Sequence, residues 1–290
     1  MNPEERIKAL IHIIEKHNHS YYVLNSPDIS DYEYDMLYKE LEELELSHPD
    51  KKLSHSPTQR VGSIVKGFDT EPHSQRMYSL DNSYNKEDLY EWVSRLKKVI
   101  GEVPIEYTCE LKYDGASISL TYENGQLTKA LTRGDGTQGD NVTANIRTIK
   151  SIPLTLKGDY PSFFEIRGEV VLPFENFKKL NDLRVSNGEE PFRNPRNTAS
   201  GSLKIQDPSI VSQRGLDCLL YQLAGNFPHV KTQSEFLEKA ASWGFKVPNT
   251  AKKCGSIEEV LEFISFYDTA RHELPYETDG VVVKVNSLEF

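Results

Sequence analysis

Cysteine is scarce in this chain of 290 residues, which contains three, Cys109, Cys218 and Cys254, far apart from one another. None forms a Cys-x-x-Cys pair, and this spacing argues against a disulfide framework and against a four-cysteine zinc site. We therefore expect the thiols to be reduced and mostly buried.

Long apolar runs are also absent. No stretch approaches the roughly 20 apolar residues of a membrane-spanning helix, and the polar, acidic start at residues 1–8 does not resemble a signal peptide. No strand leads into the G-x-G-x-x-G helix of dinucleotide-binding folds, which argues against a dehydrogenase. The expectation is a cytoplasmic protein without membrane contact.

Positive charge is in deficit, since 34 Lys and Arg residues stand against 44 Asp and Glu residues and give a net charge of -10. This negative net charge argues against a protein that binds nucleic-acid phosphates over its whole surface. It is compatible with a local basic cleft, because Arg193, Arg196 and Lys204 cluster in the sequence. The length is sufficient for one large domain or two modest ones.

The first part of the chain predicts a helical hairpin. Apolar residues recur at helical spacing in two segments, Ile7, Leu10, Ile11 and Ile14, and then Tyr34, Leu37, Leu41 and Leu44. The second helix begins with a capping box, formed by Ser30 and Glu33. A linker rich in Ser, Pro, Gly and Lys follows at 48–72, so we expect a small helical domain at 1–68 and a larger domain at 69–290.

The larger domain reads as an α+β domain with antiparallel sheet. Strands are predicted at 105–112, 116–122, 127–133, 163–172, 216–223 and 278–285, with a hairpin turn at Asn124-Gly125. Helices are predicted at 86–100, 174–186, 233–243 and 257–271.

The segment Cys109-Glu-Leu-Lys112-Tyr-Asp-Gly115 places a lysine at a strand end, before an Asp-Gly turn. Side chains alternate along a strand, so Glu110 and Lys112 share one face while Cys109 and Leu111 can enter a core. A lysine in a desolvated cleft can act as an amine nucleophile. Such short strings also arise by chance, so the context has to decide.

Two further strands carry charges within apolar runs. Glu165, Arg167 and Glu169 share one strand face, and Lys284 projects from a valine-rich strand. Such charges are costly inside a protein unless they are paired or functional. Each strand alone is equally compatible with an exposed face or a structural ion pair.

Two loops are suited to phosphate binding. A Gly-rich loop at 132–140 follows a strand and offers backbone amides and Arg133 to an anion. Residues 192–204 combine small side chains with Arg196 and Lys204, although a solvated helix start would look similar.

These segments together resemble a known family. They stand in a fixed order: Ser79-Leu-Asp-Asn82, Lys112-Tyr-Asp-Gly115, Arg133-Gly-Asp-Gly136, Arg167-Gly-Glu169, Asn194-Pro-Arg-Asn197 and Asp279-Gly-Val-Val-Val-Lys284. In this order they resemble the nucleotidyltransferase motifs of bacterial NAD-dependent DNA ligases, over essentially the whole chain. The resemblance implies an ATP-grasp-like nucleotidyltransferase domain of antiparallel sheets with flanking helices, preceded by the small helical domain.

The resemblance implies a role for each matching residue. Lys112 would attack the α-phosphate of NAD, with Asp114 as its acidic partner and Lys284, Arg196 and Mg²⁺ as neutralising charges; no metal ligand is assigned. We expect a deprotonated Lys112, favoured by burial and by a nearby cation such as Lys284 or a metal. The remaining residues implied to bind the adenosine half are Ser79, Leu80, Glu110 at the base edge, Arg133, Glu169 at a ribose hydroxyl and Tyr221, which stacks on adenine. On an apolar strand, Tyr221 alone would more commonly be a core residue.

The helical pair would select NAD by its nicotinamide mononucleotide (NMN) half. The matching residues are Tyr21, Tyr22, Asp31, Tyr34 and Asp35, and aromatic faces and carboxylates attract the cationic nicotinamide ring. Without the downstream motifs, these residues would read as caps and packing. The chain departs from the family where Tyr22 replaces a histidine of some members and where Lys204 replaces a frequent arginine, which loses bidentate geometry.

The implied function is the adenylation step of DNA ligation during replication and repair, with nicked duplex DNA as partner, mainly through domains beyond Phe290. We expect a monomeric fragment, truncated in its nucleotidyltransferase domain, that adenylates itself and seals nicks poorly or not at all. The alternatives are a nucleotidyltransferase that uses a nucleoside triphosphate, and an NAD-binding module without turnover.

Overall fold

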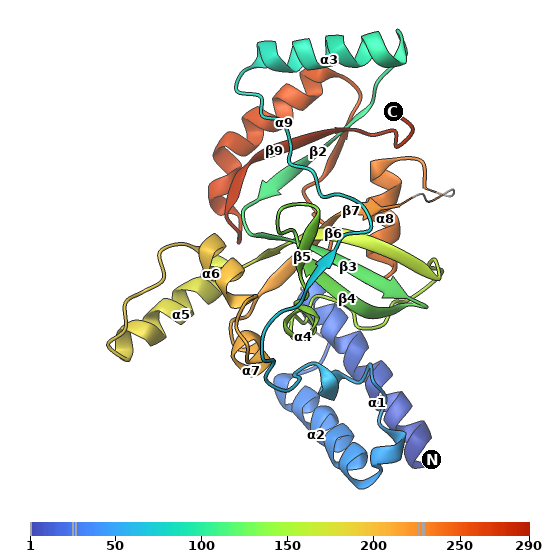
Figure 1. Ribbon diagram of the computed structural model, residues 1–290, viewed down its shortest axis with the longest axis vertical. Coiled ribbons are helices and arrows are strands. Elements are labelled where there is room, and N and C mark those ends of the chain that lie inside the picture. Colours follow the sequence, from blue (N-terminus) through green and yellow to red (C-terminus); the bar gives the residue numbers. More distant parts are fainter. Residues whose placement is uncertain (1, 25, 27, 226, 228–229) are drawn as a thin grey trace.

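The computed structural model describes residues 2–24, 26, 28–225, 227 and 230–290. Figure 1 shows a helical pair at one end, a central four-stranded sheet, and a three-stranded sheet with two covering helices at the other end. An arm of two helices projects from the centre. This is an α+β architecture with antiparallel strand pairing, as the sequence predicts.

The helical pair consists of α1 (Pro3–Asn18) and α2 (Asp31–Ser47). Both begin with a capping box, the second at Ser30 and Glu33 as predicted. The two helices pack through the apolar stripes that the sequence predicts, with Leu41 of α2 buried among the isoleucines of α1. A turn of π-helix, His19–Val23, continues α1.

The central sheet has the order β4-β3-β6-β7 and is antiparallel throughout. Its strands are β3 (Ala116–Glu123), β4 (Gln126–Thr132), β6 (Phe163–Val171) and β7 (Asp217–Ala224). The predicted hairpin joins β3 to β4: Asn124 and Gly125 have φ values of 49° and 77°, which suit a tight turn of these residues. The larger core of the protein packs on this sheet.

The second sheet has the order β8-β2-β9, formed by β8 (Lys252–Cys254), β2 (Tyr107–Tyr113) and β9 (Thr278–Val285). Helices α3 (Lys86–Ile100) and α9 (Ile257–Ala270) lie on its outer side (Figure 1). Cys109 and Leu111 are buried in this core, as their alternation with Glu110 and Lys112 predicts. The opposite face of β2, which carries Glu110 and Lys112, points away from this core and toward the central sheet.

The shorter elements complete the fold, and most of them were not predicted. They are β1 (Thr70–Pro72), which pairs with β5 (Gln138–Asp140), the helices α4 (Thr143–Ile146), α5 (Phe174–Ser186), α6 (Pro195–Ser202), α7 (Pro208–Ser212) and α8 (Gln233–Ser242), and the 3-10 turns Pro49–Lys51, Pro57–Gln59 and Arg271–Glu273. The sequence predicts α5 and α8 among them. Helix α6 has no apolar stripe to reveal it; its start is set by the Asn194 cap and by Pro195 in the first turn.

Arg60 joins the helical part to the central core. It is 8% exposed, and its Nη1 donates to the carbonyl oxygens of Arg147, Ile149 and Ile152, each at 3.1 Å. A buried guanidinium with three acceptors fixes the linker at this point. Of the helices in the described residues, none combines the length and the apolar character needed to cross a bilayer.

Candidate functional site

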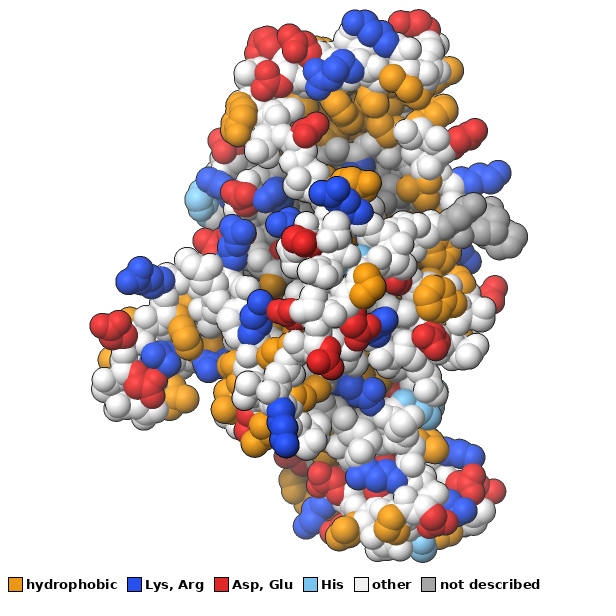
Figure 2. Space-filling view, viewed as in Figure 1, with side chains coloured by type: hydrophobic (Ala, Val, Ile, Leu, Met, Phe, Trp, Pro, Cys, Tyr) orange, Lys and Arg blue, Asp and Glu red, His pale blue; other side chains and the backbone are white. Residues whose placement is uncertain are grey.

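A cavity of about 1150 Å³ lies between the two sheets. Nine of the residues predicted for the adenosine half and the chemistry line it: Ser79, Leu80, Glu110, Lys112, Arg133, Glu169, Arg196, Tyr221 and Lys284. Figure 2 shows Lys and Arg side chains around the hollow between the upper and the middle part of the molecule. Of the three basic residues that cluster in the sequence, Arg196 lines the cavity, whereas Arg193 is not part of its lining and Lys204 pairs with Asp140 at 2.9 Å.

Lys112 lies at an irregularity in the pairing of β2 with β9. Leu111 is opposite Val281 and Tyr113 is opposite Thr278, so Lys112 faces two residues, Asp279 and Gly280. Gly280 has a φ of 137°, a conformation that favours glycine. Such a bulge re-aims side chains, and here it coincides with the contact between Lys112 and Asp279.

The carboxylate that holds Lys112 is Asp279. Lys112 Nζ donates to Asp279 Oδ2 at 2.7 Å, and the lysine side chain is 40% exposed, so the burial that the sequence analysis expects for this lysine is not found. The hydrogen bond and charge of Lys112 lower the pKa of Asp279. The family resemblance assigned the acidic partner to Asp114, so Asp279 is a site residue that the sequence analysis missed.

Asp114 makes a different contact. Its Oδ1 lies 3.3 Å from Arg196 Nη1, and its backbone N–H donates to the carbonyl oxygen of Glu277. The next residue, Gly115, lies against β6, where a Cβ would come within 2.1 Å of the Val170 carbonyl oxygen. Glycine is thus required at position 115 by its close approach to the backbone of β6.

Glu110 and Lys284 form an ion pair at the inner end of the cavity. Lys284 Nζ lies 2.8 Å from Glu110 Oε1 and donates to the carbonyl oxygen of Tyr221 at 2.9 Å. Glu110 is 2% exposed. Burial lowers the pKa of Lys284, while the charge and hydrogen bond of Glu110 oppose that shift. The charges inside the β2 and β9 runs are therefore paired across the sheet.

Glu169 and Tyr221 occupy the wall formed by the central sheet. Ser117 Oγ donates to Glu169 Oε2 at 2.7 Å and lies 3.3 Å from Tyr221 Oη. Burial raises the pKa of Glu169 to about 7, against the opposing effect of Ser117 and Lys112. Burial also raises the pKa of Tyr221. Lys284 Nζ is 5.4 Å from the centre of the Tyr221 ring.

The segment 75–80, which precedes α3, borders the cavity through Ser79 and Leu80. We call this segment the strap. Arg167 of β6 holds its start, because the guanidinium donates to the carbonyl oxygens of Gln75 at 2.5 Å and Arg76 at 3.2 Å. Arg167 lines the cavity as well. The sequence analysis placed Arg167 on a charged strand face and in one of the family motifs without assigning it a role, and its anchoring role depends on a contact that the sequence does not show.

At the Gly-rich loop, 132–140, the structure differs from the expectation that backbone amides are offered to an anion. The amides of Thr137 and Gln138 donate to Asp135 Oδ1, and the amide of Gly136 donates to the Arg133 carbonyl oxygen. These three amides are therefore engaged within the loop and are not offered to an anion. The hydrogen bonds lower the pKa of Asp135 to about 2. The side chain of Arg133 still lines the cavity.

A separate pocket of about 180 Å³ lies in the helical part. It is lined by four of the residues predicted for the nicotinamide half, Tyr21, Tyr22, Tyr34 and Asp35. The fifth, Asp31, begins α2, but its side chain lies outside what the structure describes. The central core contributes Lys150, whose Nζ donates to Tyr22 Oη at 2.9 Å.

The two pockets lie at different places. The residues that line the pocket of the helical pair and those that line the large cavity do not overlap, and the helical pair lies at the far end of the molecule from the second sheet (Figure 1). Among the described residues no group of three or more His, Cys, Asp or Glu side chains is arranged to hold a metal ion.

Fold and site define a nucleotidyltransferase: two antiparallel sheets enclose a cavity in which a lysine on a strand stands beside carboxylates, cations and an aromatic ring. The model of the NAD-dependent DNA ligase adenylation domain matches residues 65–290, and the model of the DNA ligase-like N-terminal NAD+-binding domain matches residues 1–62. The chain belongs to the NAD-dependent DNA ligase adenylation domain family.

Curated relatives agree with this assignment. The chain is 59% identical over 289 residues to the DNA ligase of Flavobacterium johnsoniae and 58% identical over 288 residues to that of Christiangramia forsetii; each match covers 99% of the chain. The DNA ligase of Bacteroides fragilis is 48% identical over 291 residues. The chain spans 43% to 44% of the length of these relatives.

Proposed function

We propose that this chain carries out the first step of NAD-dependent DNA ligation, the transfer of AMP from NAD to Lys112. The amine lone pair of Lys112 forms an N–P bond with the α-phosphorus, the P–O bond to the NMN phosphate breaks, and NMN leaves with that electron pair. The lysine ammonium gives one proton to solvent before the attack and the nitrogen gives a second to solvent once it is bonded to phosphorus, which leaves a neutral phosphoramidate nitrogen that keeps one hydrogen. Lysine is a nucleophile of this kind once it is deprotonated.

One observation carries the proposal: Lys112 opens into a cavity of about 1150 Å³ that also contains Glu110, Glu169, Tyr221 and Lys284. A nucleotide fits in a cavity of this size. We propose that Tyr221 stacks on the adenine, that Glu110 lies at the base edge and that Glu169 contacts a ribose hydroxyl. The strap with Ser79 and Leu80 would cover the same half of the dinucleotide.

Phosphoryl transfer depends on in-line positioning and on neutralisation of charge. Lys284, Arg196 and Arg133 line the cavity and are suited to the phosphates. Asp114 would orient Arg196, to which it is bound in the structure. Magnesium, which prefers one or two carboxylates together with phosphate oxygens, would be held by Asp279 or Asp114 with the substrate, and it would supply further positive charge.

The pocket of the helical pair is suited to the nicotinamide half. Its tyrosines and Asp35 offer aromatic faces and negative charge to a cationic ring. This pocket and the large cavity share no lining residue, and we propose that the helical pair moves over the cavity so that a single NAD occupies both. We propose that the part of the linker before Arg60, which is itself fixed to the core, permits this closure.

The remaining steps concern nicked duplex DNA in replication and repair, and they would rely mainly on parts of the relatives that this chain does not span. We propose that the chain works in the cytoplasm, and as a monomer, because one chain supplies both pockets. The pocket of the helical pair disfavours the use of a nucleoside triphosphate, which lacks a nicotinamide.

The test is self-adenylation. The protein is incubated with NAD and Mg²⁺, and its mass is measured before and after. We expect the mass of one AMP to be added in the wild type and no addition in Lys112→Ala. No adduct in the wild type, or an undiminished adduct in Lys112→Ala, would overturn the assignment. Pyrophosphate release from ATP without NMN release from NAD would instead favour a nucleotidyltransferase that uses triphosphates.

A further inference from the structure

Gln233, the first residue of α8, makes a contact that the proposed reaction does not account for. Its side chain is buried, at 4% exposure, and lines the large cavity. The amide Nε2 donates to Glu110 Oε1 at 2.8 Å and to the carbonyl oxygen of Tyr221 at 2.8 Å. Both amide hydrogens are therefore used, and both of their acceptors belong to residues proposed to contact the base.

Lys284 contacts the same two acceptors from another side. Its Nζ lies 2.8 Å from Glu110 Oε1 and 2.9 Å from the Tyr221 carbonyl oxygen. Glu110 Oε1 thus receives two donors, one neutral and one charged. Within the described part of the chain, Glu110 Oε2 accepts no hydrogen bond. The carboxylate is held by one oxygen, and the other is left for a ligand in the cavity.

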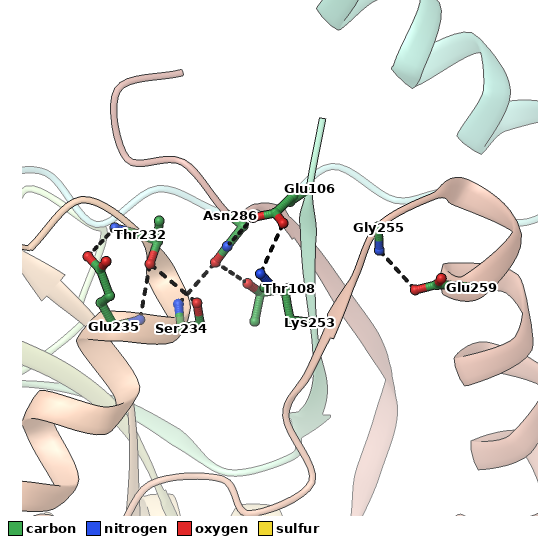
Figure 3. A network of polar contacts seen from close by, with 9 residues as sticks. All are labelled: Glu106, Thr108, Thr232, Ser234, Glu235, Lys253, Gly255, Glu259 and Asn286. Atoms are coloured by element: carbon green, nitrogen blue, oxygen red, sulfur yellow. Dashed lines mark hydrogen bonds and ion pairs between the residues drawn. The ribbon is translucent and has the colours of Figure 1, made fainter. Parts of the chain in front are cut away.

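The position of Gln233 is itself fixed by a network around Asn286, which is 1% exposed. Asn286 Oδ1 accepts from Thr108 Oγ1 at 2.8 Å and from the Ser234 N–H at 3.0 Å. The Asn286 carbonyl oxygen accepts from the Gln233 N–H at 2.7 Å. Figure 3 shows Asn286 between Thr108 of β2 and the first residues of α8.

This network connects the start of α8 to β2 at the residue two positions before Glu110. Thr108 and Glu110 lie on the same face of β2, since side chains alternate along a strand. Helix α8 is also capped at its start, where Thr232 and Glu235 form a capping box. The Asn286 network therefore holds both the start of α8, which carries Gln233, and the strand that carries Glu110. This keeps the hydrogen bond between the Gln233 amide and the Glu110 carboxylate in one geometry.

We propose that Gln233 is a positioning residue that fixes the Glu110 carboxylate so that the site selects a 6-aminopurine over a 6-oxopurine. An ionised carboxylate only accepts hydrogen bonds. A fixed Glu110 Oε2 accepts from a 6-amino group, whereas the 6-oxo group of hypoxanthine brings an acceptor against it. A carboxylate that is free to turn can instead reach the N1–H of hypoxanthine, so loss of Gln233 relaxes the selection. This inference rests on the proposed adenosine site.

The experiment compares the binding of AMP and of IMP by titration calorimetry, which does not require the reaction to occur. The variants are Gln233→Met, which keeps the length of the side chain without the amide, and Gln233→Glu, which is isosteric but places a carboxylate beside Glu110. Gln213→Met, on an exposed residue outside the cavity lining, is the matched control. Circular dichroism and thermal melting confirm that each variant is folded.

We expect the wild type and Gln213→Met to bind AMP at least about tenfold more tightly than IMP, because a site built around a hydrogen bond rejects the analogue that cannot make it. In Gln233→Met and Gln233→Glu the preference should fall about fivefold or more. A parallel loss of affinity for both nucleotides indicates a structural role only and would overturn the inference, as would a wild type that does not discriminate.

The outcome is separable from that of the proposed function. A wild type that prefers AMP and loses the preference in Gln233→Met, yet forms no adduct with NAD, supports the positioning role and contradicts the transfer to Lys112. An adduct on Lys112 together with an unchanged preference in Gln233→Met contradicts the positioning role and supports the transfer.

Discussion

Lys112 and Asp279 are 167 positions apart in the sequence, and Lys112 Nζ lies 2.7 Å from Asp279 Oδ2. The contact depends on the antiparallel pairing of β2 with β9 and on the bulge at Gly280. A carboxylate at this distance holds the amine at the cavity wall.

Asp279→Asn should slow self-adenylation by about tenfold or more, because the charge that holds Lys112 in place is lost and attack requires an oriented amine. The free energy of unfolding should change by less than about 1 kcal/mol, since both partners are solvent-exposed. The rate of AMP addition, followed by mass spectrometry, and denaturant unfolding measure the two effects.

Glu175→Gln is the matched control for Asp279→Asn. It removes the carboxylate of another exposed ion pair, between Glu175 and Lys179 at 2.5 Å on α5, outside the cavity lining. Adenylation should proceed in it at the wild-type rate. If Asp279→Asn reacts as fast as this control, Asp279 has no part in positioning Lys112.

Tyr221→Leu should weaken AMP binding about ten- to a hundredfold, because stacking of a base on an aromatic ring contributes about 1–3 kcal/mol. Tyr221→Phe keeps the ring and should bind AMP nearly as well as the wild type, since the hydroxyl has Ser117 as its hydrogen-bond partner among the residues that the structure describes, at 3.3 Å. Calorimetry with AMP measures both. Equal affinities in the leucine and phenylalanine variants would assign Tyr221 to the core.

Glu169 should make stability depend on pH. Its pKa is about 7 in the folded protein against an ordinary value of 4.5, so the folded state binds the proton more tightly than the unfolded state. The stabilisation is present in full below pH 4.5 and is lost as pH rises through about 7. The free energy of unfolding of Glu169→Gln, which stays neutral, should therefore rise relative to that of the wild type by roughly 3 kcal/mol between pH 4.5 and pH 8.

Denaturant unfolding at these two pH values measures that gain. Glu123→Gln, at the exposed end of β3, is the control and should differ from the wild type by the same amount at both. A Glu169→Gln variant whose advantage does not grow with pH would show that burial of Glu169 is not what controls its proton.

Asp35→Ala should weaken binding of the nicotinamide half of NAD without weakening binding of the adenosine half. Loss of a carboxylate from the pocket of the helical pair removes attraction for the cationic ring, so adenylation at low NAD concentration should fall about tenfold. AMP binding should not change, because Asp35 does not line the large cavity. Asp50→Ala, at an exposed residue in the 3-10 turn that follows α2, is the control. Weakened AMP binding in Asp35→Ala would contradict two separate sites.

Arg60→Met should lower the free energy of unfolding by about 2–4 kcal/mol, because it leaves three buried carbonyl oxygens without their charged donor. Arg95→Met, on the exposed side of α3, makes the same chemical change and should cost less than about 0.5 kcal/mol. Chemical denaturation compares them. Equal stabilities would mean that Arg60 does not fix the linker to the core.

The regular elements with a clear pattern were predictable. Apolar residues at helical spacing define α1, α2, α3 and α9, and Ser30 with Glu33 marks the start of α2. The short elements were not, because a helix such as α6 and strands such as β1, β5 and β8 contain too few residues to show a period. Their bounds depend on caps and on strand partners elsewhere in the chain.

The sequence predicted which residues form the candidate site better than it predicted the contacts between them. Nine predicted residues line one cavity. The sequence did not reveal that Lys112 contacts Asp279, that Gln233 contacts Glu110, or that Lys150 reaches Tyr22. Each of these contacts joins two distant segments, and no local pattern encodes the register that brings them together.

The sequence alone determined which face of β2 carries Glu110 and Lys112, because side-chain alternation is a property of the local backbone. It also determined the family, through motifs in a fixed order. The tertiary structure decided which charges meet: Lys112 with Asp279, Lys284 with Glu110, and Arg196 with Asp114. The physical reason is that an ion pair requires atoms within a few ångströms, and for segments more than 80 residues apart only strand pairing and packing set that distance.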